Sequence, residues 1–323
     1  MKTAMKICFI IGASLILLGS VIFICAMSGF KWDFKNLTTS KLKTSSYEIT
    51  EDFDGIYIKT DEADISFAVS DNDSYKVICY ESENTAHNVK VVNGKLKVEI
   101  VNNRKWYEYI GIFGGGNPMI TVYLPRGEYG SLTVESSTGD IGVPKDFSFE
   151  SADISLSTGD VLFEASSVGE LKIVTTTGDI DLRSSRVAGA DLSVSTGHVR
   201  VADTQLDGEL KIGVSTGKAK VVDVNCKSFA SSGTTGDLYL KNLLVEEKLT
   251  AKRSTGDVEF YSCDASELFI ECGTGDVEGT LRSEKVFVTK TGTGDVEVPR
   301  STSGGVCEVI TSTGDIEISI GRD

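Results

Sequence analysis

The stretch "KIVTTTGDIDL", residues 172–182, places a Thr-Gly-Asp triplet between two short runs in which apolar and polar residues alternate. Its Thr-Gly pair is one of ten, which follow one another at intervals of 20, 19, 19, 20, 19, 20, 19, 19 and 20 residues. A steady period of about 20 residues is typical of a solenoid, in which every repeat winds one coil. The glycines of these pairs are Gly139, Gly159, Gly178, Gly197, Gly217, Gly236, Gly256, Gly275, Gly294 and Gly314.

The residues around each glycine alternate with a period of two. Counting the glycine as zero, positions +2 and +4 are apolar in nearly every copy, as in Ile180 and Leu182, and positions −7, −5 and −3 are often apolar. This pattern indicates a strand, a turn and a second strand with one buried face. About five inward side chains per coil, each contributing roughly 1.5–3 kcal/mol when it is a Val, Leu or Ile, suffice without covering helices. We therefore predict an all-β fold, a single β-solenoid similar to a parallel β-helix with coils of 19–20 residues.

The triplet itself has the composition of a tight turn. Glycine in all ten copies predicts a positive φ. Aspartate follows it in eight copies, and a turn carboxylate commonly accepts hydrogen bonds from nearby backbone N–H groups. Threonine precedes it in all ten copies, and we assign this threonine to the inward face by its parity. The triplet is thus interpreted as a structural corner.

A column of cation-binding carboxylates is the alternative interpretation of the same triplet. Stacked strands lie about 4.8 Å apart, so neighbouring carboxylates repel one another and a cation would relieve that repulsion. One aspartate per coil supplies few ligands, however, and His198 and Lys218 interrupt the series. We favour the corner and predict no catalytic residue, no cofactor and no metal site. The alternative column comprises Asp237, Asp257, Asp276, Asp295 and Asp315, preceded by Asp140, Asp160 and Asp179.

The N-terminal segment differs from the repeats. Lys2 and Lys6 precede an uncharged apolar run over residues 7–30, which as a helix of roughly 36 Å would cross a bilayer core of about 30 Å. We predict a cytoplasmic N-terminus at residues 1–6, a transmembrane anchor at residues 7–30 and a polar stalk at residues 31–49. A cleaved signal peptide is the alternative.

The repeat register extends upstream of the first Thr-Gly pair. The stretch "GIYIKTDEADISF" aligns with the repeats when Ala63 takes the glycine position, which puts Ile56 and Ile58 before the corner and Ile65 and Phe67 after it. Ala63 precedes Gly139 by 76 residues, or four steps of 19, so we expect several degenerate coils between them. Residues 50–130 are assigned to degenerate N-terminal coils and residues 131–323 to the regular solenoid.

At this point the chain resembles a known family, the membrane-anchored "putative adhesins" of bacterial envelopes, also called toast-rack or β-strand-repeat proteins. The resemblance rests on "FDGIYIKTDEADI", on "ITVYLP" and on the repeated Ser-Thr-Gly-Asp. It implies a single-pass protein of the bacterial cell membrane with an extracytoplasmic C-terminal domain. The domain is classed as of unknown function, so the resemblance brings no catalytic residues to this chain.

The net charge and the cysteine spacing argue against two kinds of ligand, nucleic acid and zinc. The net charge of −15, from 47 acidic and 32 basic residues, argues against nucleic acid, whose phosphates are bound by clustered Lys and Arg. The seven cysteines form no disulfide framework by spacing, and no CxxC pair or Cys/His cluster indicates zinc. We therefore interpret the cysteines of the repeats as small core residues.

One stretch interrupts the rhythm of the repeats. Residues 101–119, "VNNRKWYEYIGIFGGGNPM", combine aromatic residues with three consecutive glycines. An aromatic loop that leaves a solenoid could bind a partner, and the alternative is a loop folded back over the coils. The candidate partner-binding residues are Trp106, Tyr107, Tyr109, Ile112 and Phe113.

These observations favour a non-catalytic, membrane-anchored scaffold for protein contacts, of the envelope-stress or signalling type. An adhesin or glycan-binding surface protein is the alternative, and a polysaccharide-active β-helix enzyme is a remote one. Because the last strand, "DIEISI", is followed by only three residues, we also expect an open C-terminal coil that could contact a partner or a second copy.

Overall fold

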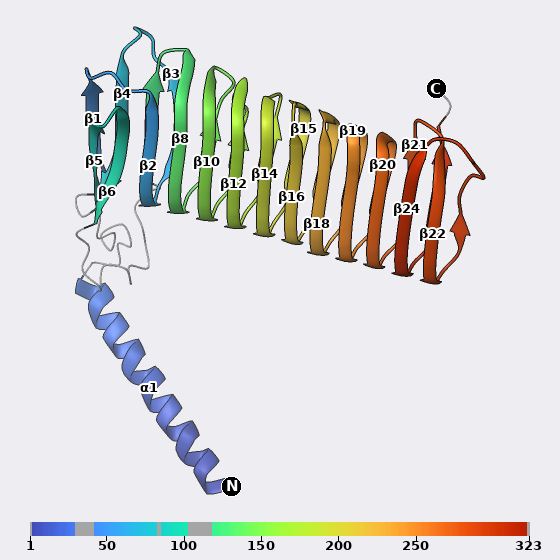
Figure 1. The fold of residues 1–323 in the computed structure, drawn as a ribbon. Coiled ribbons are helices and arrows are strands. Elements are labelled where there is room, and N and C mark those ends of the chain that lie inside the picture. Colours follow the sequence, from blue (N-terminus) through green and yellow to red (C-terminus); the bar gives the residue numbers. More distant parts are fainter. Residues whose placement is uncertain (1, 30–41, 83–84, 103–117, 322–323) are drawn as a thin grey trace.

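The protein is a β-solenoid preceded by one helix (Figure 1). The computed structural model describes residues 2–29, 42–82, 85–102 and 118–321, and the candidate partner-binding residues of the aromatic stretch lie outside these ranges. Within them, the chain forms α1 (Lys2–Gly29) and a continuous 25-stranded sheet wound into coils. The predicted fold class is confirmed.

Two parallel ladders of strands form the main sides of the solenoid. The first, in spatial order, contains β6 (Lys95–Asn102), β2 (Gly55–Glu62), β8 (Gly127–Thr138), β10 (Phe147–Thr158), β12 (Ser167–Thr177), β14 (Arg186–Thr196), β16 (Glu209–Thr216), β18 (Ser228–Thr235), β19 (Leu238–Thr255), β20 (Val258–Thr274), β24 (Gly305–Thr313) and β22 (Lys285–Thr293). The second contains β7 (Met119–Leu124), β3 (Asp64–Val69), β9 (Ile141–Val143), β11 (Val161–Phe163), β13 (Ile180–Arg183), β15 (Val199–Leu206), β17 (Ala219–Cys226), the first halves of β19 and β20, β21 (Val277–Leu281), β25 (Ile316–Ile320) and β23 (Val296–Glu297). Three antiparallel strands, β1 (Leu42–Ile49), β4 (Tyr75–Ser82) and β5 (Thr85–Val92), complete the N-terminal end.

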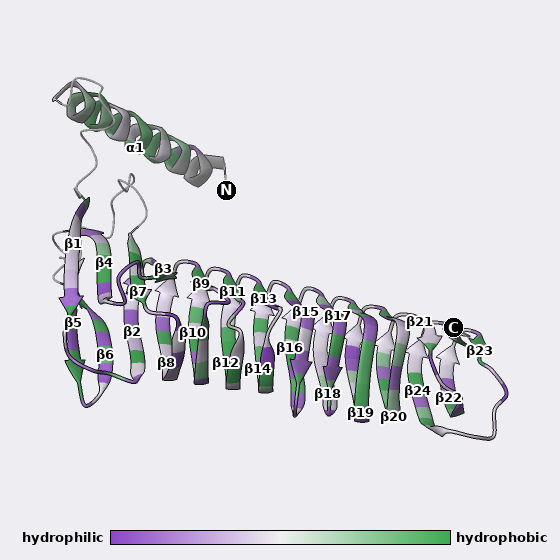
Figure 2. Cartoon of the chain, turned by 90° about the horizontal axis from the view of Figure 1, so that it is seen from above, coloured by the Kyte–Doolittle hydropathy of each residue, from purple (hydrophilic) through white to green (hydrophobic). Residues whose placement is uncertain are grey.

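The interior of the coils is filled by the alternate residues that the sequence pattern identifies. Ile180 and Leu182 are fully buried, and they align in parallel register with Val199 and Val201 of the next coil. Figure 2 shows the resulting alternation of hydrophobic and hydrophilic bands along the strands. The buried residues form one continuous hydrophobic cluster from Ile56 to Ile318, which is the core of the domain.

Each Thr-Gly-Asp triplet forms the same corner. The ten glycines have φ between +123° and +145°, a conformation that residues with a Cβ rarely adopt. A Cβ on any of them would also come closer than 3.0 Å to the carbonyl oxygen of the corner residue in the neighbouring coil. Glycine is therefore required twice at this position, once for the backbone angle and once for the stacking of the coils.

The residues that flank the glycine have different environments. The aspartate at +1 accepts a hydrogen bond from the next coil, as where Asp160 N–H donates to Asp140 Oδ1 at 2.9 Å. The threonine at −1 is exposed in all ten copies, so our assignment of this position to the interior is wrong. The pleat that fills the core ends at position −3, and the turn carries the next two residues outward, as Thr175, Thr176 and Thr177 illustrate.

A second corner lies six residues after the glycine, and the triplet pattern does not predict it. The residues there have φ between +50° and +56°, which short polar side chains tolerate better than others. Parallel pairing resumes beyond the bend, as in the pairing of Thr204 with Val224. The corner residues are Ser184, Asp203, Asp223, Asn242 and Ser262.

The last coil of the sequence is not the last coil of the solenoid. β24 pairs with β20 on one side and with β22 on the other, and β25 likewise lies between β21 and β23 (Figure 1). The outermost coil is therefore the penultimate one, where Val288 and Val296 are 52% and 42% exposed. Our expectation that "DIEISI" forms the outermost strand is wrong: β25 pairs with β21 along its length and with β23 at Ile316 and Glu317.

The N-terminal end shows the same arrangement. β2 lies between β6 and β8, and β3 lies between β7 and β9, so the coil of Ala63 stacks directly on that of Gly139 without intervening coils. Ile56 and Ile58 align with Leu132 and Val134, as the register predicts. Residues 42–49, which we expected to belong to a stalk, form β1 and pair with β4.

α1 has the surface of a helix that needs an apolar environment. Its segment Phe9–Gly29 is long and apolar enough to cross a membrane, and side chains such as Phe9 and Ile16 are more than 70% exposed. Length and composition are equally compatible with an anchor and with a signal sequence.

The assignment of inward and outward positions can be tested with one substitution on each face of β13. Ile180→Asn puts an amide into the core and should lower the free energy of unfolding by about 3 kcal/mol or more. Asp181→Asn removes only a partly exposed ion pair with Arg183 and should cost less than about 1 kcal/mol. Denaturant unfolding followed by circular dichroism measures both, and equal losses would contradict the inward and outward assignments.

The glycine corner can be tested in the same way. Gly217→Ala should destabilise the protein by at least about 2 kcal/mol, because the alanine is strained at φ +134° and its Cβ collides with the neighbouring coil. Gly142→Ala is the control, since a Cβ there has no heavy atom within 4 Å. A Gly217→Ala variant as stable as Gly142→Ala would show that the coils do not need glycine at the corner.

Candidate functional site

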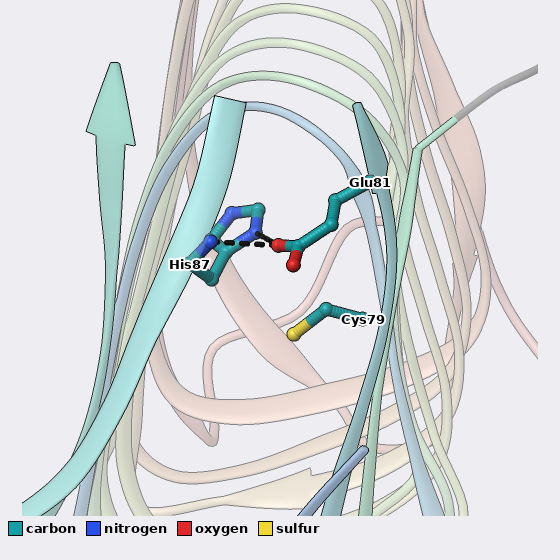
Figure 3. A group of neighbouring side chains, drawn as sticks. All are labelled: Cys79, Glu81 and His87. Carbon is teal, nitrogen blue, oxygen red and sulfur yellow. Dashed lines mark hydrogen bonds and ion pairs between the residues drawn. The ribbon is translucent and has the colours of Figure 1, made fainter. Parts of the chain in front are cut away.

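Three titratable side chains meet inside the N-terminal end of the solenoid (Figure 3). Cys79 and Glu81 are two residues apart on β4 and therefore face the same side of the strand. His87 lies on β5, the strand that follows β4 in the chain. All three are at most 4% exposed. The cluster brings a buried carboxylate and a buried imidazole together in a core that is mainly apolar.

Hydrogen bonds fix the imidazole ring of His87. Its Nδ1 lies 2.8 Å from Glu81 Oε2, and its backbone N–H donates to the same oxygen at 2.6 Å. Its Nε2 lies 3.0 Å from the hydroxyl of Thr60 on β2, and the Tyr47 hydroxyl on β1 donates to its backbone carbonyl at 2.9 Å. Strands β1, β2, β4 and β5 thus all contribute to the position of one histidine.

One oxygen atom of the cluster lacks a hydrogen-bond partner, and two groups in or beside the cluster have raised pKa values. Glu81 Oε1 is buried and has no hydrogen-bond partner among the residues that the structure describes, although buried polar atoms nearly always have one. Burial, with a smaller contribution from the Glu81 charge, raises the pKa of the Cys79 thiol to about 12. Burial first, and then the charges of Glu81 and Cys79, raise the pKa of Tyr47 above its usual value.

These properties do not suit a catalytic cysteine. A nucleophilic cysteine requires a lowered thiol pKa and access for the substrate, whereas the pKa of Cys79 is raised and its side chain is fully buried. The donor atoms of Cys79, Glu81 and His87 nevertheless all lie within 4.8 Å of one another, as metal ligands do. The sequence alone indicates this cluster only weakly, because the three residues lie outside the repeats. They come together only where the chain turns back from β4 into β5.

The aspartate column predicted as an alternative cation site does form along the corner. The first four carboxylates each accept the backbone N–H of the next coil through Oδ1, and the stack in spatial order is Asp237, Asp257, Asp276, Asp315 and Asp295. At the interruption, Lys218 forms a 2.7 Å ion pair with Asp237, and its hydrogen bond lowers the Asp237 pKa. Backbone hydrogen bonds therefore give these carboxylates a structural role, and Lys218 pairs with the first of them.

A second column of carboxylates runs beside the last aspartates. Glu259, Glu278, Glu317 and Glu297 occupy paired positions on β20, β21, β25 and β23, and we call them the glutamate ladder. Burial first, and then the charge of Glu317, raises the pKa of Glu278. The C-terminal coils thus carry two parallel rows of negative charge on one surface.

Comparison with known proteins places the chain among toastrack proteins. Residues 53–213 match the family described as Toastrack DUF4097, and no curated protein matches the chain. Among solved structures, a "putative adhesin" from Parabacteroides distasonis ATCC 8503 is 15% identical, with a TM-score of 0.49, over 87% of this chain and 98% of its own. A "putative lipid binding protein" from the same organism is 14% identical (TM-score 0.47, 86% and 97% covered).

A further "putative adhesin", from Bacteroides fragilis NCTC 9343, is 14% identical with a TM-score of 0.42, over 86% of this chain and 97% of its own. The family match begins at the "FDGIYIKTDEADI" motif and continues into the Thr-Gly-Asp repeats on which the sequence resemblance rests. Residues 53–213 thus form a toastrack domain of the family DUF4097, as the sequence motifs indicate.

Proposed function

We propose that this protein is a non-catalytic, membrane-anchored scaffold of the bacterial envelope whose extracytoplasmic solenoid binds other proteins. The observation that carries the proposal is the pair of negative rows on the C-terminal coils, where the glutamate ladder runs beside Asp257, Asp276, Asp315 and Asp295. α1 supplies the anchor in this proposal, and the solenoid holds the charged surface at the end of a long, regularly bonded rack.

Electrostatics favour a protein partner with a basic segment. Neighbouring strands are spaced by about 4.8 Å, so the carboxylates of each row repel one another. Burial first, and then the charge of Glu317, raises the pKa of Glu278. A row of Lys or Arg on a partner would relieve this repulsion. The same charge disfavours attachment to anionic wall polymers or lipids, in keeping with the net charge of −15. Envelope-stress or signalling complexes are the assemblies that we assign to such a scaffold.

A glycan-binding adhesin is the second candidate. The threonines before the ten glycines are exposed and stacked in register, as in Thr158, Thr177 and Thr196, and residues one position earlier are mostly Ser or Thr. This row of hydroxyl groups, which we call the hydroxyl ladder, offers donors and acceptors to a polysaccharide. The remote alternative of a polysaccharide-active enzyme draws no support from the cluster of Cys79, Glu81 and His87, because it is sealed from solvent.

The protein-binding proposal predicts site-specific cross-linking. A photoreactive amino acid in place of Ser319, beside the glutamate ladder, should capture envelope proteins from the intact membrane, whereas the same group at Ser155 on the first ladder should not. Glu278→Lys should reduce the capture about tenfold, or about 1.4 kcal/mol, and added salt should reduce it further. Asp153→Lys makes the same charge change elsewhere and should have no effect. Equal capture from both positions would contradict the proposal.

The glycan-binding candidate predicts a different result. Purified wall polysaccharide should retain the full-length protein, and the double substitution Thr177→Val and Thr196→Val, which removes two hydroxyls at constant shape, should weaken that retention. Thr133→Val and Thr250→Val, placed on the first ladder away from the corner, form the control. Retention that is unchanged by the corner substitutions would rule out the hydroxyl ladder as the glycan surface.

A further inference from the structure

The cluster at the N-terminal end offers the donor set of a transition-metal site. A thiol, a carboxylate and an imidazole are the ligands that Zn²⁺ prefers in proteins. Bonds of about 2.0–2.3 Å in tetrahedral geometry place donor atoms roughly 3.3–3.8 Å apart. The donors of Cys79, Glu81 and His87 lie within 4.8 Å of one another, so movements of about 1 Å would bring them to this geometry.

A second observation points to a ligand at the same place. Glu81 is 1% exposed, and its Oε1 lacks any hydrogen-bond partner. Leaving a buried charged acceptor unsatisfied is costly, and proteins rarely retain one without a compensating contact. Figure 3 shows the carboxylate, the imidazole and the thiol converging from β4 and β5. A cation between them would supply the contact that Glu81 lacks.

The orientation of His87 fits the same interpretation. Metal-binding histidines usually donate their other ring N–H to a fixed acceptor, which selects the tautomer and aligns the ring. With Nδ1 facing Glu81, the opposite nitrogen, Nε2, lies 3.0 Å from the buried hydroxyl of Thr60. In the metal-free chain Nδ1–H donates to the acceptor Glu81, and Nε2 accepts from the Thr60 hydroxyl. On metal binding the imidazole proton would move to Nε2, which would then donate to Thr60 and leave the Nδ1 lone pair free to bind the metal.

We propose that Cys79 Sγ, a carboxylate oxygen of Glu81 and His87 Nδ1 bind one divalent transition-metal ion of the Zn²⁺ type inside the N-terminal end of the solenoid. On binding, the thiol loses its proton to solvent, and a thiolate, a carboxylate and a neutral imidazole together balance the charge of +2. A buried site with zero net charge avoids most of the penalty that an isolated ion pays in an apolar interior. The Nδ1 contact with Glu81 is replaced by the metal.

The ion would join β4 and β5, which are attached to the ends of the two parallel ladders by antiparallel pairing. β4 pairs with β1 and β7, and β5 pairs, among the described strands, with β6. The metal would bridge Cys79 and Glu81 on β4 with His87 on β5. The imidazole would in turn connect it to Thr60 of β2, so the ion would close this end of the interior. Such a metal adds its binding free energy to the folding of the end that lies closest to α1 in the sequence.

Titration with Co²⁺, a spectroscopic substitute for Zn²⁺, tests the proposal directly. The full-length chain in detergent, reduced and treated with a chelator, should bind one equivalent of Co²⁺ and develop a thiolate-to-cobalt charge-transfer band that Zn²⁺ abolishes. The thermal midpoint of the unsubstituted chain should rise with added Zn²⁺. Absence of the band at one equivalent in the unsubstituted protein would overturn the proposal, whatever the variants do.

Substitutions identify the ligands. Cys79→Ser and His87→Gln should abolish the band and the thermal shift, whereas Cys226→Ser, a buried cysteine of the central coils, and Cys25→Ser in α1 should retain both. Thr60→Val should weaken Co²⁺ binding about 10–100-fold while the band persists. Co²⁺ on the exposed carboxylate rows would give no thiolate band. A band that survives Cys79→Ser in a folded protein would place the metal elsewhere and overturn the proposal.

Discussion

The close approach of one coil to the next at the glycine corner is the constraint on which the rest of the structure depends. The carbonyl oxygen of each corner residue occupies the space that a Cβ of the neighbouring glycine would need, as at Gly197 and Gly217. Only this approach keeps the backbone of adjacent coils in hydrogen-bonding register on both sides of the turn, with Gly197 N–H donating to the Thr216 carbonyl. The register in turn stacks identical positions, so one rule of alternation fills the whole interior.

Sequence reasoning succeeds where a structural demand admits one residue type and fails where it admits several. Glycine alone meets the demand of the first corner, so its spacing predicts coil length, inward positions and even the place of Ala63. The second corner accepts Asp203, Asn242 or Ser262, and no single letter repeats there. The threonine before the glycine was misplaced because parity continues in the sequence although the pleat itself ends at position −3. The cluster at Cys79 depends on an antiparallel return that no repeat encodes.

The order of the coils at the two ends cannot be predicted from the sequence, for a different reason. Because the repeats are nearly equivalent, β20 could pair with either β22 or β24, and only the connections decide that the later strand lies inside. The result places the first and the last coil of the sequence between two neighbours each. The edge that remains at the C-terminal end belongs to β22 and to β23, which is only two residues long. The short β23 limits pairing with other chains on its side, whereas the nine residues of β22 present a longer edge.

Two sets of polar groups at the ends of the solenoid serve neither a corner nor the regular core. Most core positions of the central coils hold Val, Leu or Ile, and the buried Arg253 there is hydrogen-bonded to Ser231. The N-terminal end buries Glu81 and His87, and the C-terminal end exposes the glutamate ladder. Both arrangements reduce stability in isolation, one through an unsatisfied acceptor and the other through repulsion between like charges. These groups lower the stability of the fold without forming a corner or filling the core, and a bound ligand would offset that loss of stability. On this physical ground the two proposals place a ligand at each end of the solenoid, because a cation at the first end and a basic partner at the second would each remove the local penalty.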